Sequence, residues 1–225
     1  MHMARLQVIK SVDILRANTN IRDAHRAQLI WLKKLDKIRI ENLDPLGKLG
    51  YRFNRAYDDY NQLFLKYLGI GILEALERPH MNRPLRMLDD GAGEGLLLKV
   101  MKEKLAIKGI EIETTGIGLA RCPKLEANAD FAYAKDALFY IPQNKQDLIV
   151  SLHGALFFMA PQLAEISAMK YAYSLDRGGI AVLCLDIPNG KDREGEFAQK
   201  FNSEGFDATA HFHIAFGMIL IIKKH

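Results

Sequence analysis

The chain has 225 residues, of which 49% are apolar and 26% are charged, and its formal net charge at pH 7 is +4. This composition is that of an ordinary soluble globular protein, and it excludes the collagen-like, low-complexity and disulfide-scaffold classes. Lys and Arg outnumber Asp and Glu by 16 to 9 in residues 1–86. Such an excess is typical either of a solvated helix face or of a surface for anionic partners such as RNA.

The cysteines and the apolar runs give no sign of secretion or of a membrane. Cys122 and Cys184 form no CxxC pair, which predicts free thiols in a reducing compartment. Residues 1–5 lack the apolar core of a signal peptide. The longest nearly uncharged run, 148–164, contains His153 and Pro161, so no membrane span is predicted. We therefore expect a cytoplasmic protein.

Residues 1–83 are predicted to form an N-terminal helical cap that ends at two prolines in the segment 79–84. Apolar residues at alternating spacings of three and four over residues 21–38 predict one amphipathic helix. A second helix is predicted from Phe53 through Leu76. Its aromatic residues share one face, which indicates core packing, while its other side can face a pocket. They are Phe53, Tyr57, Tyr60, Phe64 and Tyr67.

From residue 84 to residue 225, strand patterns alternate with helix patterns, which predicts a three-layer α/β domain. The predicted strands are 85–90, 110–117, 131–134, 147–152 and 180–185, and the predicted helices are 96–105, 161–175 and 195–202. Segments 206–214 and 218–222 are predicted to form a terminal β-hairpin. The Asp-Arg-Gly-Gly segment 176–179 is predicted to be the turn before the fifth strand.

The strongest signal is the sequence Asp-Asp-Gly-Ala-Gly-Glu-Gly at 89–95, between the first predicted strand and its helix. Glycines allow a sharp turn and let a ligand approach the backbone. The helix that follows directs its free N–H groups at the same place, which suits a carboxylate or a phosphate. A strand before the motif and a helix after it are the context that supports a ligand-binding loop.

This motif resembles the Asp-x-Gly-x-Gly-x-Gly loop of class I, seven-stranded S-adenosylmethionine-dependent methyltransferases. The resemblance extends from about Leu85 to the C-terminus, and the predicted hairpin is similar to the family's antiparallel sixth and seventh strands. It implies a Rossmann-like, doubly wound and mostly parallel seven-stranded sheet. It also implies S-adenosylmethionine as the cofactor.

Carried over residue by residue, the resemblance implies a set of cofactor-binding positions. The glycine loop would hold the methionine moiety and the ribose side, Asp136 would bind the adenine amino group unless it is only a turn cap, and the end of the fourth strand would lie beside the sulfonium. The implied residues are Asp89, Gly91, Ala92, Gly93, Gly95, Gly118, Leu119, Asp136, Ala137, Ser151, Leu152 and, by a weaker two-residue match, Tyr57.

Gly118 is a departure from the family's pattern. The family usually has an acidic residue there, at the end of the second strand, which binds both ribose hydroxyls. Loss of such charge-assisted hydrogen bonds costs about 1.5–3 kcal/mol each. Arg121, three residues on, leaves a phosphorylated nicotinamide cofactor as the minor alternative. Leu96 argues against it, because a dinucleotide loop has its third glycine at that position.

Direct methyl transfer needs alignment and exclusion of water more than a strong catalytic signature. His153, at the end of the fourth strand, is the candidate general base, and a packed core histidine is the alternative. Asp186 follows the fifth strand as a further acceptor, and His211 and His213 are predicted to share one face of the hairpin. No metal-ligand spacing is present.

The function predicted from sequence is therefore methyl transfer to a small molecule, with RNA as the second acceptor class. The alternative is an inactive methyltransferase-like scaffold, which Gly118 favours. In that case the apolar face of 21–38, which includes Trp31, would be a partner surface. A homodimer is left open.

Overall fold

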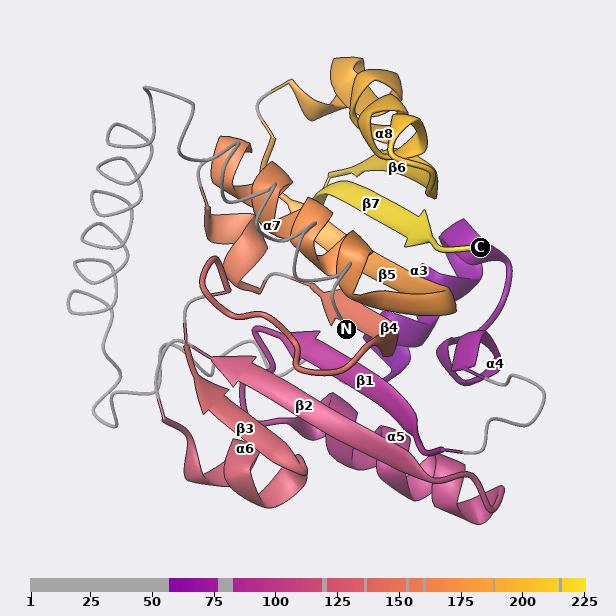
Figure 1. The fold of residues 1–225 in the computed structure, drawn as a ribbon, viewed down its shortest axis with the longest axis vertical. Helices are drawn as coiled ribbons and strands as arrows, with labels where there is room; N and C mark the ends of the chain where they lie inside the picture. Colours follow the sequence, from indigo (N-terminus) through magenta and orange to yellow (C-terminus); the bar gives the residue numbers. More distant parts are fainter. Residues whose placement is uncertain are drawn as a thin grey trace.

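The computed structural model describes residues 57–76, 83–118, 121–135, 137–152, 154–159, 161–187, 189–214 and 216–225. Seven strands form one sheet in the order β3-β2-β1-β4-β5-β7-β6 (Figure 1). Strands β1 to β5 run parallel to one another, and β7 is antiparallel to both β5 and β6. The strands are β1 (Leu85–Asp90), β2 (Ile112–Gly118), β3 (Phe131–Ala134), β4 (Gln146–Ser151), β5 (Leu175–Leu185), β6 (Asp207–His213) and β7 (Gly217–Lys223).

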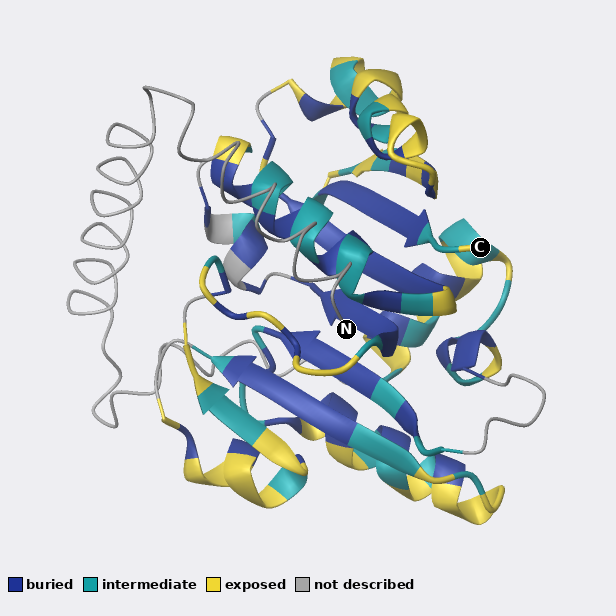
Figure 2. Cartoon of the chain, in the orientation of Figure 1, coloured by how far each residue is buried: buried dark blue, intermediate teal, exposed yellow. Residues whose placement is uncertain are grey.

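Helices cover both faces of the sheet, so its central strands β1 and β4 are buried along nearly their whole length. One face packs against α7 (Pro161–Ser174) and α8 (Glu194–Ser203). The other packs against α3 (Tyr57–Leu68), α4 (Ile72–Leu76), α5 (Leu96–Ile107) and α6 (Pro123–Asn128). Figure 2 shows the resulting buried layer through the middle of the molecule. The predicted doubly wound sheet with a terminal antiparallel hairpin is confirmed.

The second predicted helix is not continuous, and this part of the prediction was wrong. Helix α3 ends at Leu68, Gly69 has a φ of 72°, and α4 begins at Ile72. The Ile72 N–H donates to Asn61 Oδ1 at 3.0 Å, so the start of α4 is held against α3. Tyr60 and Phe64 are buried, so the core role predicted for these two aromatic residues is confirmed. The predicted helix 21–38, including Trp31, and Phe53 lie outside the described residues.

The segment 176–179 is not a simple turn before the fifth strand. Strand β5 already begins at Leu175, and its pairing with β4 moves from Leu175↔Gln146 to Ile180↔Leu148, which is a β-bulge. Gly178 N–H donates to the Lys224 carbonyl, and Lys224 N–H donates to the Gly179 carbonyl. The end of the chain therefore holds this segment in the sheet.

Three short elements were not predicted: α6, the 3-10 helix η2 (Ala155–Phe158) and the 3-10 helix η3 (Gly190–Arg193). Each is too short for a periodic apolar pattern, although Pro123 at the start of α6 is a helix-start signal. The other boundaries agree with the prediction within a few residues.

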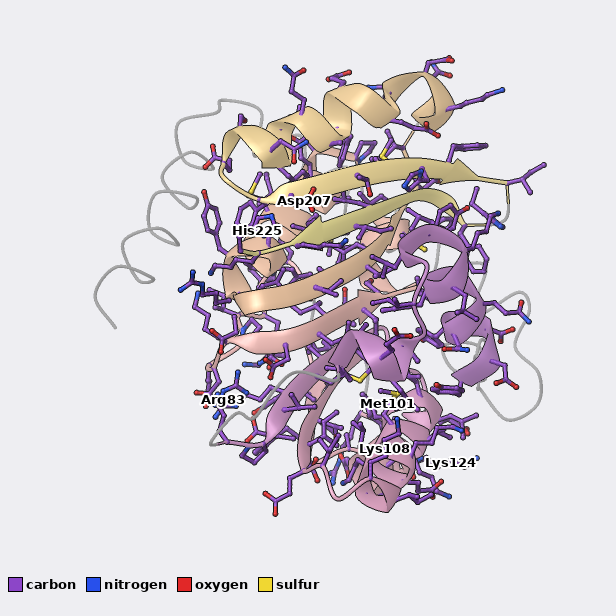
Figure 3. All side chains as sticks on the ribbon, turned by 90° about the vertical axis from the view of Figure 1, so that its right-hand side faces the viewer. Arg83, Met101, Lys108, Lys124, Asp207 and His225 are labelled. Atoms are coloured by element: carbon purple, nitrogen blue, oxygen red, sulfur yellow. The ribbon has the colours of Figure 1, made fainter. Side chains whose placement is uncertain are left out.

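Arg83 ties together the amino-terminal ends of three strands. Its guanidinium forms two hydrogen bonds with the carboxylate of Asp147, at 2.7 and 3.0 Å, and a third with Asp176 at 2.6 Å. The Asp147 side chain is fully buried and also accepts from the Arg86 N–H at 2.8 Å. Figure 3 shows Arg83 at this edge of the sheet, opposite the edge to which the glycine motif belongs.

Candidate functional site: the glycine loop and the ends of strands β1, β2 and β4

The glycine motif is a tight turn between β1 and α5. Gly91, Gly93 and Gly95 have φ values of 82°, 56° and 76°, a region that residues with a Cβ rarely adopt. The N–H groups of Gly91 and Ala92 both donate to the Ile117 carbonyl of β2 at 3.0 Å. The loop therefore closes over the junction of β1 and β2, at the carboxyl edge where ligands bind in open α/β sheets.

Gly154 touches the glycine loop from the end of β4. A Cβ on Gly91 would lie 2.2 Å from Gly154 Cα, and a Cβ on Gly154 would lie 1.9 Å from the Asp90 carbonyl oxygen. The two loops thus meet backbone to backbone. Sequence reasoning missed Gly154 and treated it only as an interruption of an apolar run. Its place directly after a parallel strand was the available signal.

Two carboxyl groups are buried at the end of β1. Asp89 and Asp90 are each 1% exposed, and Ser151 Oγ at the end of β4 donates to Asp90 Oδ2 at 3.2 Å. Both carboxyl oxygens of Asp89 are buried without a hydrogen-bond partner. Burial, together with the Asp90 charge, raises the pKa of Asp89 to about 8. The sequence predicted Asp89 at the site, but did not single out Asp90.

The end of β2 carries Gly118, so the described part of this strand brings no acid to the position that the family uses for the ribose. Beyond it, the guanidinium of Arg121 binds the carboxylate of Glu126 at 2.6 and 3.2 Å. This ion pair raises the pKa of Arg121 and lowers the pKa of Glu126. Arg121 is thus engaged by a carboxylate, which weakens the nicotinamide alternative.

A second ion pair connects the glycine loop to α6. Lys124 Nζ binds both carboxylate oxygens of Glu94, at 3.0 and 2.9 Å, and Asn128 Nδ2 donates to the Glu94 carbonyl at 2.8 Å. Lys124 is labelled in Figure 3, away from Arg83 at the other end of the strands. These contacts hold the loop against the helix that follows β2.

The remaining predicted positions divide into three groups. Ser151, Leu152 and Ala137 are buried, at the end of β4 and after β3. Tyr57 contacts the last turn of α5, where Lys104 Nζ lies 4.7 Å from its ring centroid, and that contact does not bring it to the glycine loop at the other end of α5. Three predicted residues lie outside the described residues: Leu119, Asp136 and His153.

His211 and His213 lie on one face of β6, as predicted, because both rings contact Tyr67. The Tyr67 ring stacks on His211 at a centroid distance of 5.1 Å and meets the edge of His213 at 6.4 Å. His213 also packs against Phe216 at 4.8 Å. Burial, and then the positive charge of Lys66, lower the pKa of His213. Sequence reasoning had found no partner for these histidines.

The residues present fit S-adenosylmethionine, the cofactor that the motif implies. A buried carboxyl group without a partner suits an ammonium group, and three glycines with positive φ leave the loop backbone open to a ligand. Among the residues that the structure describes, no group of three or more His, Cys, Asp or Glu side chains could hold a metal ion. Within the same residues, no helix is long and apolar enough to span a membrane.

Of three comparisons with known proteins, only the comparison with solved structures found similar proteins. No protein-family model and no curated protein sequence matches this chain. Among solved structures, magnesium protoporphyrin IX methyltransferase from Synechocystis PCC 6803 with bound S-adenosylmethionine has a TM-score of 0.51 and 14% identity, over 82% of this chain and 86% of that chain.

Two further structures are similar to the same extent. The 1,6-didemethyltoxoflavin-N1-methyltransferase of Burkholderia thailandensis has a TM-score of 0.53 and 14% identity, over 89% of this chain and 90% of that chain. The amino pentose methyltransferase CalS10 of Micromonospora echinaspora has a TM-score of 0.51 and 15% identity, over 81% of this chain and 98% of that chain. Together with the sheet order, these matches show that the chain has the class I S-adenosylmethionine-dependent methyltransferase fold.

Proposed function

We propose that this protein is a methyltransferase that binds S-adenosylmethionine at the glycine loop and transfers its methyl group directly to an acceptor. The observation that carries the proposal is the buried, unpartnered carboxyl group of Asp89, beside a loop of three positive-φ glycines in this fold. When bound, S-adenosylmethionine supplies a methyl group on a sulfonium, which a nucleophile can displace.

Each residue of the proposed site has a role that follows from its position. Asp89 accepts from the ammonium group of the cofactor, and Gly91, Gly93 and Gly95 let the cofactor approach the loop backbone. Ser151 holds Asp90 and so fixes the end of β4 beside β1. By the resemblance, Asp136 binds the adenine, and Gly118 lies beside a ribose that receives no charged acceptor from β2.

The chemistry at the acceptor consists mainly of alignment and exclusion of water. The buried ends of β1 and β4 supply a dry wall on one side of the site. We assign to His153 the role of accepting a proton from the acceptor, since in the sequence it comes two residues after Ser151, the last residue of β4, and the carboxyl ends of parallel strands line the crevice where ligands bind.

A small molecule is the acceptor class that we favour. The similar structures include enzymes that are named for small-molecule substrates, a protoporphyrin, a toxoflavin precursor and an amino pentose. RNA is the second class, because of the basic excess in residues 1–86. A methyltransferase-like scaffold without turnover is the competing function, and the absence of an acid at Gly118 favours it.

Transfer of label from methyl-tritiated S-adenosylmethionine tests the proposal. The wild-type protein and Gly93→Arg, which places a long side chain in the loop, are each incubated with a metabolite extract or with total RNA. We expect label in the metabolite fraction with the wild type alone. Label in RNA alone would move the acceptor to the second class. Tight cofactor binding with no label in either fraction would support the scaffold.

A further inference from the structure

Two adjacent buried carboxyl groups, Asp89 and Asp90, lie at the start of the glycine loop and differ in their hydrogen bonding. Successive residues of a strand point to opposite faces of the sheet, so Asp89 and Asp90 lie on opposite faces of β1. Asp90 accepts a hydrogen bond from Ser151, whereas both oxygens of Asp89 are buried with no hydrogen bond. A role in packing gives no reason for an unsatisfied carboxyl group there, because an unpaired polar group in the core is costly.

None of the described residues around Asp89 places a positive charge next to its carboxyl group. The strands on either side present Gly116 and Val150 in register with it, and the first turn of α5 is Leu96–Leu98. Glu94, the acidic residue within the glycine loop, is bound by Lys124. The charge that acts on Asp89 is that of Asp90, and with burial it raises the pKa of Asp89 to about 8. Without a ligand, Asp89 is therefore protonated at neutral pH.

We propose that Asp89 exchanges its proton for the ammonium group of the bound ligand, so that each binding event releases one proton to solvent. The O–H bond of the carboxyl group breaks, its electron pair stays on the carboxylate, and the ligand's ammonium keeps its three protons. The proposal rests on the proposed function, since S-adenosylmethionine is the ligand that brings this ammonium. It adds that binding is coupled to pH and selects for a free ammonium group.

This exchange has a quantitative consequence for affinity. A ligand that releases one proton binds about tenfold more tightly for each unit of pH, as long as the pH is below the pKa of the releasing group. The affinity levels off above about pH 8, where Asp89 is already ionised before the ligand binds. A ligand without the ammonium gains nothing from the ionised carboxylate.

The test is calorimetric titration with S-adenosylhomocysteine, which has the ammonium group but no sulfonium charge. Titrations at several values between about pH 6 and 7.5, each in two buffers of different ionisation enthalpy, give both the affinity and the number of protons released. We expect about one proton per ligand and a tenfold gain in affinity per pH unit. 5′-Methylthioadenosine, which lacks the amino-acid chain, serves as the matched ligand and should release none.

Two variants test whether Asp89 is the group that releases the proton on binding. Asp89→Asn should abolish the proton release. Asp90→Asn removes the neighbouring charge but can still accept from Ser151, and should move the release to lower pH and tighten binding at pH 6.5. The shift under Asp90→Asn is a result that a purely structural Asp90 would not give.

The outcomes separate this inference from the proposed function. Binding of S-adenosylhomocysteine by the wild type with no proton release, or release that persists in Asp89→Asn, would overturn the exchange and leave the function standing. No binding of S-adenosylhomocysteine at any pH would contradict the proposed function itself.

Discussion

The backbone of Gly91 lies directly against that of Gly154, so that a Cβ on Gly91 would fall 2.2 Å from Gly154 Cα. This contact joins the loop after β1 to the loop after β4, which flank the proposed cofactor site. No side chain can be added at either position without moving backbone. The close approach therefore makes both glycines structural requirements of the site.

We expect Gly91→Ala and Gly154→Ala to lower the free energy of unfolding by more than about 1 kcal/mol and to weaken cofactor binding together. Gly109→Ala is the matched control, since Gly109 has a φ of 70° but no atom within 4 Å of an added Cβ. Urea denaturation measures the stability and calorimetry the binding. Equal losses in Gly91→Ala and Gly109→Ala would show that backbone strain alone, and not the contact, matters.

Gly118→Asp should strengthen cofactor binding. It restores a charged acceptor at the end of β2, and such hydrogen bonds contribute about 1.5–3 kcal/mol, which corresponds to roughly a ten- to hundredfold lower Kd. Gly118→Ala controls for the loss of glycine. If Gly118→Asp binds S-adenosylhomocysteine no better than Gly118→Ala, the ribose does not lie at this strand end.

Arg83→Met should be strongly destabilising. It removes the two hydrogen bonds and the positive charge that the Arg83 guanidinium gives to the fully buried carboxylate of Asp147, and breaking a buried ion pair in this way costs about 3–5 kcal/mol. The control is Arg193→Met, which removes a more exposed ion pair with Glu196 and should cost less than about 1 kcal/mol. Similar midpoints of urea unfolding for the two variants would argue against the role of Arg83 as an anchor.

Asp89→Asn should stabilise the unliganded protein, increasingly so as the pH rises. The folded chain keeps on Asp89 a proton that the unfolded chain loses, because burial raises the pKa to about 8 from 3.8. The contribution of Asp89 to stability therefore falls between about pH 4 and 8 and is constant above that range. We expect the gain to reach a few kcal/mol near pH 8. The free energies of unfolding of variant and wild type are measured by urea titration at about pH 5 and at about pH 8. The same difference between the two proteins at both pH values would contradict this prediction.

The sequence predicts much of the fold, because periodic patterns report burial directly. The apolar run 148–150 in β4, the alternating pattern of β6 and the continuous apolar run of β7 all have their predicted places in the sheet. What the periodicity could not show is where an element breaks. Gly69 separates α3 from α4 just after Tyr67, the last residue of the aromatic stripe, where the sequence pattern predicts one continuous helix. The β-bulge at Asp176 depends on contacts with Lys224 and Arg83, which are far away in sequence.

The part of the candidate site that a contiguous motif forms could be predicted from the sequence. The parts that depend on contacts between distant segments could not. The glycine loop was located because its residues are contiguous. The contact with Gly154 arises from a loop more than sixty residues away along the chain, and the contact of Tyr67 with His211 and His213 joins the beginning of the described chain to its end. Leu119, Asp136 and His153 stay predictions.

The measurement that tests the central claim most directly is calorimetric titration of the wild type and of Gly93→Arg with S-adenosylmethionine at pH 7.5. We expect micromolar binding by the wild type and a loss of at least about a hundredfold in Gly93→Arg, since the new side chain would fill the loop. No binding by the wild type at millimolar cofactor, or equal binding by the two proteins, would contradict a cofactor site at the glycine loop.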